Sequence, residues 1–438
     1  MVSDGKIERV FGVCIENQRI FRDENCLGKG YRPELKEILH RETEKAELIP
    51  NLSKALKGVT PSNTLVYGKT GTGKTMLLRV LTKQLEKEAL EYSFKVKTIH
   101  IVCNAIRTNV GVIKELNSQL ETELHLNHND IKAANSFDSY FKKFCILANK
   151  YEGQLIIILD EVDKLEDDEL INNLARAKEN EFLDKNIAII GITNDIKYDE
   201  KLDPRTKSVL GQRDMMFSPY NANQLRDILY QRAEKAFNHG VLDDTIIPLC
   251  AAYAAQEHGD ARKAIELLMY SGNIAEEQHA DKVTENHIDL ARERIETDKT
   301  TEFIRTLPTQ SKLVLAACIS NVSQKSQTYT GEIHNSYKQM AQEIGIEVLT
   351  QRRTTDLISE LGMSSLLNVI EIFKGRYGRT REVTLAITPS LAWYILMEDD
   401  RLQNLKEAYT PSKPKMMDVN QASLKEFRDY SDPLPNIP

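Results

Sequence analysis

The sequence predicts an α/β fold in which helices cover a parallel sheet, followed by an all-helical domain and a C-terminal winged helix. Three observations predict this order. Short apolar runs alternate with helical patterns from about residue 63 to 218, helical patterns alone fill 220–296, and helix–helix–turn–helix plus a hairpin follows from about 300. The expected domains are 1–218, 219–298, 299–409 and a tail with few apolar anchors, 410–438.

The first domain carries the strand signals. Strands that are buried on both faces of a parallel sheet read as continuous apolar runs. Before them, the segment around Pro33–Leu48 has a helical pattern. The runs that we expect to form strands are TLVYG, KTIHIVC, LIIILD, NIAIIGIT and DMMFSP.

Composition narrows the class of protein. A chain of 438 residues with 41% hydrophobic and 28% charged residues is typical of two or three domains with substantial cores. No apolar run approaches the roughly 18 residues of a membrane helix, and the start MVSDGKIERV does not resemble a signal peptide, so we expect a cytoplasmic protein. The six cysteines lack C-x-x-C spacing, which argues against a zinc site. A net charge of −7 leaves any attraction to DNA to local basic patches.

The strand TLVYG runs into GKTGTGKT, Gly68 to Thr75, and a helical pattern follows. This is the G-x-x-x-x-G-K-T loop in its expected context of strand before and helix after. Glycines such as Gly68 let backbone amides wrap the phosphates, and the start of the helix adds partial positive charge. Lys74 can reach the β- and γ-phosphates, and Thr75 can offer its hydroxyl to Mg²⁺. The predicted phosphate-binding residues are Gly71, Thr72, Gly73, Lys74 and Thr75.

Polar side chains follow two later strands. LIIILDEVD should deliver Asp160 and Glu161 at the carboxyl end of a buried strand, beside the phosphate loop. Asp160 would hold Mg²⁺, Glu161 would orient or deprotonate the attacking water, and Asp163 would cap the following helix. NIAIIGITND contains a further buried strand that ends in Asn194, a neutral group suited to orienting water near the γ-phosphate. Together these motifs predict a nucleoside-triphosphate switch or hydrolase.

The C-terminal domain carries a candidate DNA-binding surface. Thr350 can cap a helix that stops at Gly362, and its apolar stripe is Thr354, Leu357, Ile358 and Leu361. Arg352 and Arg353 then lie near the N-terminal end on other faces, where a recognition helix touches DNA. The hairpin turn KGRYGRTR is suited to neutralising phosphates. The candidate DNA-binding residues are Arg352, Arg353, Lys374, Arg376, Arg379 and Arg381.

Several further stretches resemble one family, the AAA+ initiators of the origin recognition complex and cell-division-control type, in their archaeal form. The stretches are HRETEKAEL, PSNTLVYGKTGTGKT, GITNDIKY, LDPRTKS, FSPYNANQLRDIL, GDARKAIELL and YTGEIHNSY. The likeness covers roughly residues 20–395 and implies an AAA+ P-loop sheet, a helical lid and a winged helix. The segment between Asn104 and Ser136, where initiators carry a DNA-contacting insert, matches poorly.

The resemblance also implies roles for single residues. Asn194 is similar to the sensor-1 residue, and Arg262 looks like sensor 2, which closes the lid onto the γ-phosphate. Arg205 is the candidate arginine finger for a neighbouring subunit, with Arg213 as the alternative. The remaining residues that the family places near the nucleotide are His40, Arg41, Tyr220 and Arg232.

The function that the resemblance implies is ATP-dependent origin binding. Such a protein initiates replication, helps load the replicative helicase and uses ATP with Mg²⁺ as a slow switch. Its expected partners are double-stranded origin DNA, the replicative helicase and other initiator subunits, with no membrane. Two alternatives remain open: a branch-migration motor, which would form a hexameric ring with fast DNA-stimulated turnover, and a signalling ATPase, which would not bind duplex DNA.

Overall fold

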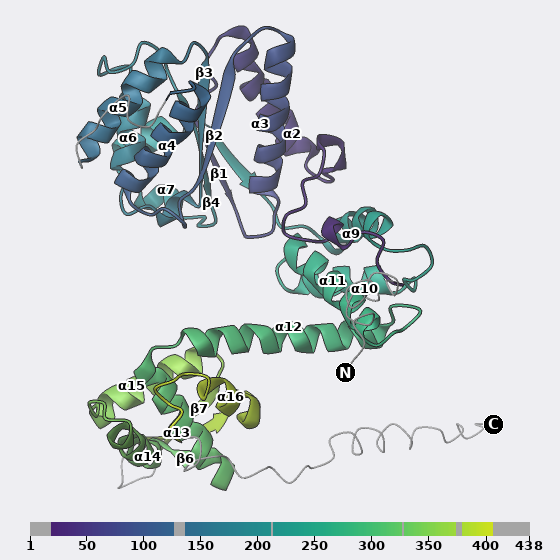
Figure 1. Ribbon diagram of the computed structural model, residues 1–438, viewed down its shortest axis with the longest axis vertical. Coiled ribbons are helices and arrows are strands. Elements are labelled where there is room, and N and C mark those ends of the chain that lie inside the picture. Colours follow the sequence, from purple (N-terminus) through teal and green to yellow (C-terminus); the bar gives the residue numbers. More distant parts are fainter. Residues whose placement is uncertain (1–18, 127–135, 212, 326–327, 374–378, 406–438) are drawn as a thin grey trace, which may run out of the picture. The chain divides into compact units, whose positions relative to one another are not determined.

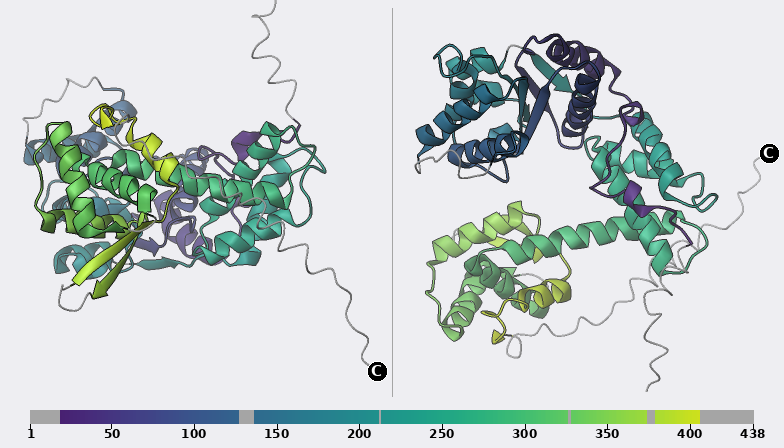
Figure 2. Two further views of the ribbon diagram at one scale, coloured as in Figure 1. Left: turned by 90° about the horizontal axis from the view of Figure 1, so that it is seen from below. Right: turned by 45° about the horizontal axis from the view of Figure 1, so that its top comes forward.

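A computed structural model describes residues 19–126, 136–211, 213–325, 328–373 and 379–405. These residues form two compact units that divide between Arg292 and Glu293, and each unit is described by itself (Figure 1 and Figure 2). The predicted tail, residues 410–438, and two predicted wing residues, Lys374 and Arg376, lie outside the described ranges. Within those ranges, no helix is both long and apolar enough to cross a membrane.

A five-stranded parallel sheet organises the first unit. Its order is β2-β3-β4-β1-β5, and each pair of neighbouring strands runs parallel. The predicted α/β class is therefore confirmed, because all five apolar runs form strands. Their bounds are β1 (Thr64–Gly68), β2 (Val96–Val102), β3 (Gln154–Asp160), β4 (Ala188–Thr193) and β5 (Asp214–Phe217).

Helices cover both faces of this sheet (Figure 1). Along β3, Ile156 and Ile158 pack on one side and Ile157 and Leu159 on the other, because successive side chains of a strand alternate. The helices on the Ile156 side are α2 (Glu42–Leu52) and α3 (Lys74–Glu91). Those on the Ile157 side are α4 (Asn109–Glu123), α5 (Phe137–Lys150) and α6 (Glu169–Arg176). From Leu155 to Asp160, β3 is therefore buried on both faces, as its apolar run predicts.

The segment before the sheet differs from the single helix expected over Pro33–Leu48. It forms the 3-10 turn η3 (Leu35–Glu37), and α2 begins only at Glu42. His40 interrupts the helical pattern with a φ of +57°, a left-handed conformation that a helix does not contain. The remaining short turns of this region are η2 (Glu24–Cys26) and η4 (Ser53–Lys57).

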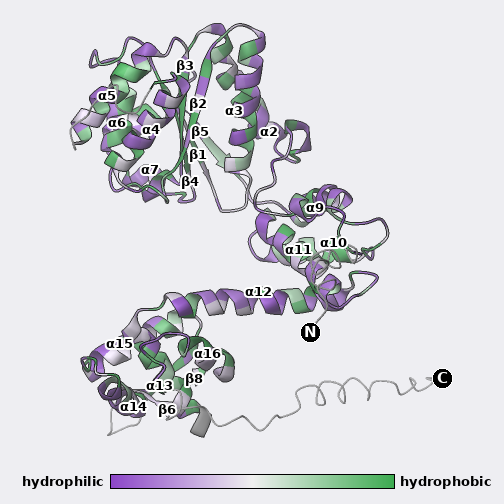
Figure 3. Cartoon of the chain, in the orientation of Figure 1, coloured by the Kyte–Doolittle hydropathy of each residue, from purple (hydrophilic) through white to green (hydrophobic). Residues whose placement is uncertain are grey.

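An all-helical lid completes the first unit. The N-terminal segment packs on it, with the rings of Phe21 and Phe237 4.8 Å apart. The lid helices are α9 (Ala222–Ala236), α10 (Ile246–Gln256) and α11 (Ala261–Glu277). Further short helices lie between Glu161 and the lid in the sequence: η5 (Val162–Lys164), α7 (Tyr198–Lys201) and α8 (Pro204–Leu210). The helix α12 (Glu285–Thr306), which is largely hydrophilic (Figure 3), runs through the division between the units.

The second unit is a winged helix, as predicted. Its sheet is antiparallel, in the order β6-β8-β7. Its elements are α13 (Thr309–Lys325), β6 (Thr328–Tyr329), α14 (Thr330–Glu343), α15 (Gln351–Met363), β7 (Leu367–Phe373), β8 (Arg379–Leu385) and α16 (Pro389–Leu396). Thr350 caps α15 by accepting from the Arg353 amide, and the expected stripe of α15 is buried. The expectation that Gly362 ends this helix is wrong by one residue.

Candidate nucleotide site and winged-helix surface

The loop between β1 and α3 is shaped by two glycines with positive φ. Gly71 has a φ of +71° and Gly73 a φ of +87°, values that side-chain-bearing residues rarely adopt. Neither has room for a Cβ: at Gly71 it would overlap the carboxylate of Asp260, and at Gly73 it would lie 2.9 Å from the Tyr220 hydroxyl. The loop therefore depends on glycine for its backbone conformation and for its contact with the lid.

Lys74 lies at the start of α3 and is 5% exposed. Its ammonium group donates to the Gly68 carbonyl at 2.6 Å, to the Lys69 carbonyl at 2.7 Å and to Asn194 Oδ1 at 2.9 Å. Burial, reinforced by the Arg262 cation, lowers the pKa of Lys74 to about 8. The lowered pKa means that burial disfavours the charged form of Lys74. A buried cation inside a loop of backbone amides is suited to binding an anion, which would offset this unfavourable burial.

Asp160, the last residue of β3, lies beside the phosphate loop. Thr75 Oγ1 donates to Asp160 Oδ1 over 3.1 Å, and Asp160 is 6% exposed. His100, on β2, lies 3.5 Å from Asp160 Oδ2. Burial, together with the Arg79 cation, lowers the pKa of His100 to about 4, which leaves the ring neutral at pH 7. A hydroxyl beside a carboxylate is the pair of hard oxygen ligands that Mg²⁺ prefers.

Glu161 follows Asp160 in a left-handed conformation with a φ of +53°. This turn ends the strand and begins η5 with the Glu161 side chain only partly exposed. Backbone strain of this kind costs roughly 1–3 kcal/mol and gathers at functional sites. Asp163 does not cap α6, whose N-cap is Asp168. Instead it accepts a hydrogen bond from the Thr193 hydroxyl at 2.8 Å.

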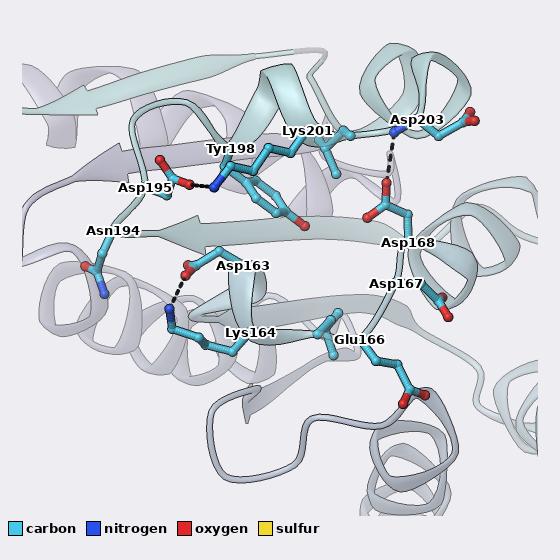
Figure 4. A pocket seen from close by; sticks show the side chains of 12 residues that line it. Asp163, Lys164, Glu166, Asp167, Asp168, Asn194, Asp195, Tyr198, Lys201 and Asp203 are labelled. Carbon is cyan, nitrogen blue, oxygen red and sulfur yellow. Dashed lines mark hydrogen bonds and ion pairs between the residues drawn. The ribbon is translucent and has the colours of Figure 1, made fainter. Parts of the chain in front are cut away.

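A pocket of about 940 Å³ opens beside Asn194 (Figure 4). Its acidic lining is largely engaged within the chain: Asp195 pairs with Lys201, Asp163 with Lys164, and Asp168 accepts from the Asp203 amide. These contacts stabilise the turns and short helices around the pocket, so its acidic side chains have structural roles. It borders the nucleotide site through Asn194.

The lid touches the phosphate loop directly. Thr70 Oγ1 donates to Asp260 Oδ2 over 3.3 Å, and the Ala261 amide donates to the Gly71 carbonyl over 3.3 Å. The sequence prediction missed Asp260. Its place before Ala261 in GDARKA is that of a helix N-cap, and only the fold shows that this cap lies on the loop.

Arg41 is buried and uses all three guanidinium nitrogens within the chain. Nε donates to the Thr72 carbonyl and to the Tyr220 hydroxyl, Nη1 to Glu44 at 2.7 Å, and Nη2 to the Ser218 carbonyl at 2.8 Å. The guanidinium also lies 4.0 Å from the centre of the Tyr220 ring. Arg41 thus joins α2, the phosphate loop and the start of the lid.

Arg232 and His40 join the N-terminal segment to α9 of the lid. Arg232 stacks on Tyr31, 3.8 Å from the ring centre, and donates to the Cys26 carbonyl at 3.3 Å. His40 Nε2 lies 3.0 Å from Asp227 Oδ2. Both side chains therefore tie this segment to the lid. Their roles in nucleotide binding stay predictions.

Three other arginines are exposed. Arg262 is the second residue of α11 and is close enough to Lys74 to lower the pKa of that lysine. Arg205 lies on α8, with its backbone amide capped by Asp203, and Arg213 lies immediately before β5. The structure brings Arg262 toward the phosphate loop, and it leaves Arg205 and Arg213 on the surface.

In the second unit, Arg352 and Arg353 are exposed at the start of α15, and Arg353 forms a surface ion pair with Glu360 at 3.3 Å. Arg381 differs, because its guanidinium donates to Glu371 and to Ser359. Arg379 begins β8, and its side chain lies outside what the structure describes.

The residues of the first unit fit a magnesium–nucleoside-triphosphate complex. The glycine backbone leaves amides free of Cβ atoms, Lys74 carries the charge, and Thr75 with Asp160 supplies oxygen ligands. Asn194 accepts a hydrogen bond from Lys74, so its side chain lies beside the phosphate loop.

Comparison with known families covers all three parts of the chain. Residues 58–192 match the AAA domain, 226–293 the Cdc6 AAA+ ATPase-type lid domain, and 302–394 the CDC6 C-terminal winged helix domain. The ORC1-type DNA replication protein 1 of Methanosarcina acetivorans is 41% identical over 421 residues, which cover 95% of this chain and all of that one. This chain belongs to the ORC1/Cdc6 family.

Other ORC1/Cdc6 proteins agree with this assignment. The ORC1-type DNA replication protein of Thermococcus kodakarensis is 40% identical over 408 residues, or 92% of this chain and 97% of that one. The structure of the Aeropyrum pernix ORC1 protein in complex with DNA superposes with a TM-score of 0.75 at 37% identity, covering 88% and 99% of the two chains. As a member of the ORC1/Cdc6 family with its AAA domain, the chain is a nucleotide-binding AAA+ ATPase.

Proposed function

We propose that this protein is an ATP-dependent initiator of DNA replication that binds duplex DNA at origins and helps load the replicative helicase. The observation that carries the proposal is the 41% identity to an ORC1-type DNA replication protein over 95% of the chain. An identity that extends over so much of the chain includes the nucleotide site and the winged helix together. Neither part alone distinguishes an initiator from other ATPases.

The nucleotide of the proposal is ATP with Mg²⁺. Amides of Gly71, Thr72 and Gly73 would wrap the phosphates, and Lys74 would exchange its loop carbonyls for β- and γ-phosphate oxygens. Thr75 and Asp160 would hold Mg²⁺. Their hydrogen bond of 3.1 Å supports this role, since ligands of one ion must lie close together.

Hydrolysis in this proposal is slow and acts as a switch. Glu161 would orient or deprotonate the attacking water, with Asn194 beside the terminal phosphate. Arg262, exposed at the start of α11 and electrostatically coupled to Lys74, would clamp the lid when the γ-phosphate is present. Arg205 would complete the site of a neighbouring initiator subunit. Its exposure on α8 is consistent with action outside its own chain.

The DNA-binding surface of the proposal is the winged helix. Arg352 and Arg353 would contact DNA from the start of α15, where both are exposed. Lys374, Arg376 and Arg379 of the wing would contact phosphates. The A. pernix relative, which has the same fold over most of its length, was solved with DNA bound, and that supports the assignment.

The proposal is tested by mapping the sites that the tagged full-length protein occupies on its own genome. One or a few sharp peaks beside replication start points are expected. In parallel, a purified protein with Mg²⁺ and ATP should bind duplex DNA as single molecules or small assemblies. Broad occupancy without peaks, or a hexameric ring with fast DNA-stimulated turnover, would favour a DNA motor. Absence of duplex binding with and without ATP would favour a signalling ATPase.

A further inference from the structure

Arg381 of β8 is held inside the winged helix by two other residues. Its Nε and Nη2 donate to Glu371 Oε1 at 3.2 and 3.1 Å, and its Nη1 donates to Ser359 Oγ. Glu371 lies on β7 and Ser359 on α15. We call Ser359, Glu371 and Arg381 the wing–helix brace.

The strand register places two members of the brace opposite each other. Glu371 and Arg381 are direct partners in the antiparallel pairing of β7 with β8. Opposite charges at such a position stabilise the pair, and the planar guanidinium suits a carboxylate. The Arg381 side chain is 30% exposed and that of Glu371 61%, so the arginine is the more enclosed partner.

A second contact fixes α15 against the same hairpin. Gly362 lies three residues after Ser359, so both occupy one side of the helix. A Cβ at Gly362 would lie 3.0 Å from Val369 Cγ2, so a larger residue here would require Val369 or the helix to shift slightly. The hairpin and the helix therefore meet at two points, Gly362 with Val369 and Ser359 with Arg381.

All three nitrogens of the Arg381 guanidinium already have acceptors in the chain. Three of its five N–H groups are therefore used inside the domain, and a DNA phosphate could accept at most from the other two. In contrast, Arg352 on the same helix as Ser359 is exposed. The geometry separates an arginine that orients the domain from arginines that are available to DNA.

We propose that Arg381 is a positioning residue: it fixes the angle between the wing and the recognition helix, and so controls sequence discrimination without contacting phosphate. The proposal rests on the proposed function, because it requires that the winged helix bind DNA. Contacts to DNA phosphates do not depend on the DNA sequence, whereas contacts to base edges do. For base contacts, the recognition helix must lie at one position in the groove while the wing lies along the DNA backbone. If the β7–β8 hairpin could tilt relative to α15, the domain would keep its positive charges, but the recognition helix would no longer be held at one position on the bases.

This proposal and direct phosphate contact predict different salt dependence. A side chain that neutralises one phosphate contributes about 0.9 to the slope of log affinity against log salt, for any duplex sequence. A brace contributes nothing to that slope. Its loss lowers the affinity for a preferred duplex and leaves the affinity for a scrambled duplex of equal length unchanged.

The test uses the full-length protein, a preferred duplex selected with it from a random library, and a scrambled duplex of the same composition. The central variant is the double substitution Glu371→Gln/Arg381→Met, which keeps the net charge constant. The milder Glu371→Gln and Ser359→Ala each remove one partner. Thermal unfolding of each variant checks that the second unit is folded, and Arg352→Met serves as the control expected to lower the slope.

The double variant should bind the preferred duplex roughly 5- to 30-fold more weakly, the ratio that the loss of a small set of hydrogen bonds produces. Its affinity for the scrambled duplex and its salt slope should equal those of the unmodified protein. Glu371→Gln should also lower the preference, although it removes a negative charge. Three results would each contradict the positioning role of Arg381. The double variant could bind both duplexes more weakly by the same factor with a smaller salt slope, it could bind both as the unmodified protein does, or Glu371→Gln could bind DNA more strongly. If the unmodified protein binds no duplex, the proposed function itself fails.

Discussion

The Thr75 hydroxyl donates a hydrogen bond to the Asp160 carboxylate over 3.1 Å, which joins the start of α3 to the end of β3. In the sheet, β4 separates β3 from β1. Asn194, which follows β4, bonds to Lys74 at 2.9 Å. Because parallel strands end at one edge of the sheet, three segments distant in sequence meet at the phosphate loop.

Gly71→Ala should destabilise the protein by about 2–4 kcal/mol. A left-handed alanine costs roughly 1 kcal/mol, and the new Cβ would also displace Asp260 from the loop. The matched control is Gly240→Ala, since Gly240 has a φ of +79° and a Cβ added there would meet nothing within 4 Å. Calorimetric unfolding of both variants measures the difference. Equal destabilisation would show that the lid contact contributes nothing.

Arg41→Met should lower stability by about 3–5 kcal/mol, because it leaves Glu44 and two carbonyls without their buried partner. Arg262→Met changes an exposed side chain, so the free energy of unfolding should change by less than about 0.5 kcal/mol. The same variant should hydrolyse ATP more slowly. Unfolding and ATP hydrolysis are measured on both variants. If Arg41→Met were as stable as the unmodified protein, the tie between loop and lid would be energetically unimportant.

ATP affinity should fall as the pH rises above about 8. Burial lowers the pKa of Lys74 to about 8, so above that pH the free protein loses a proton that phosphate binding needs it to regain. Folding has the opposite sign: between about pH 8 and the ordinary lysine pKa, the unfolded chain keeps a proton that the folded chain has lost, so the free energy of unfolding rises as the pH rises. Calorimetric titration in buffers of different ionisation enthalpy should detect proton uptake on binding at a pH about one unit above the lowered pKa. Binding without proton uptake there would contradict the lowered pKa.

Arg205→Ala should leave ATP affinity unchanged and slow hydrolysis by about 10³-fold, since arginine fingers contribute at least that much in comparable enzymes. The loss should appear only where subunits adjoin, for example on DNA that binds several copies. Arg213→Ala is the matched control, because Arg213 is also exposed and would be the alternative finger. A slow Arg213 variant beside a normal Arg205 variant would reverse the assignment.

Most of the fold followed from local signals in the sequence. LIIILD is apolar up to its final acid because its strand is buried on both faces, and G-x-x-x-x-G-K-T fixes the strand–loop–helix connection. The stripe that ends in Leu361 identified the buried face of α15, and Thr350 identified its start.

The parts that could not be predicted are long-range contacts. No pattern in HRETEKAEL shows that Arg41 inserts between the phosphate loop and the lid, or that His40 has a positive φ that delays α2. Gly362 looks like a helix end, yet it permits close packing of α15 on Val369. Arg381 belongs to a basic run, and only the register with Glu371 shows that its guanidinium is engaged.

The most direct test of the central claim is the equilibrium binding of ATP with Mg²⁺ to Lys74→Ala. Lys74 is buried in the phosphate loop, whereas Lys69, the other lysine of the loop, is exposed. We expect the unmodified protein to bind ATP and the folded variant to lose binding by at least about 100-fold, the effect of removing a buried charge from a phosphate site. Retention of tight ATP binding by Lys74→Ala would contradict the assignment of the nucleotide site.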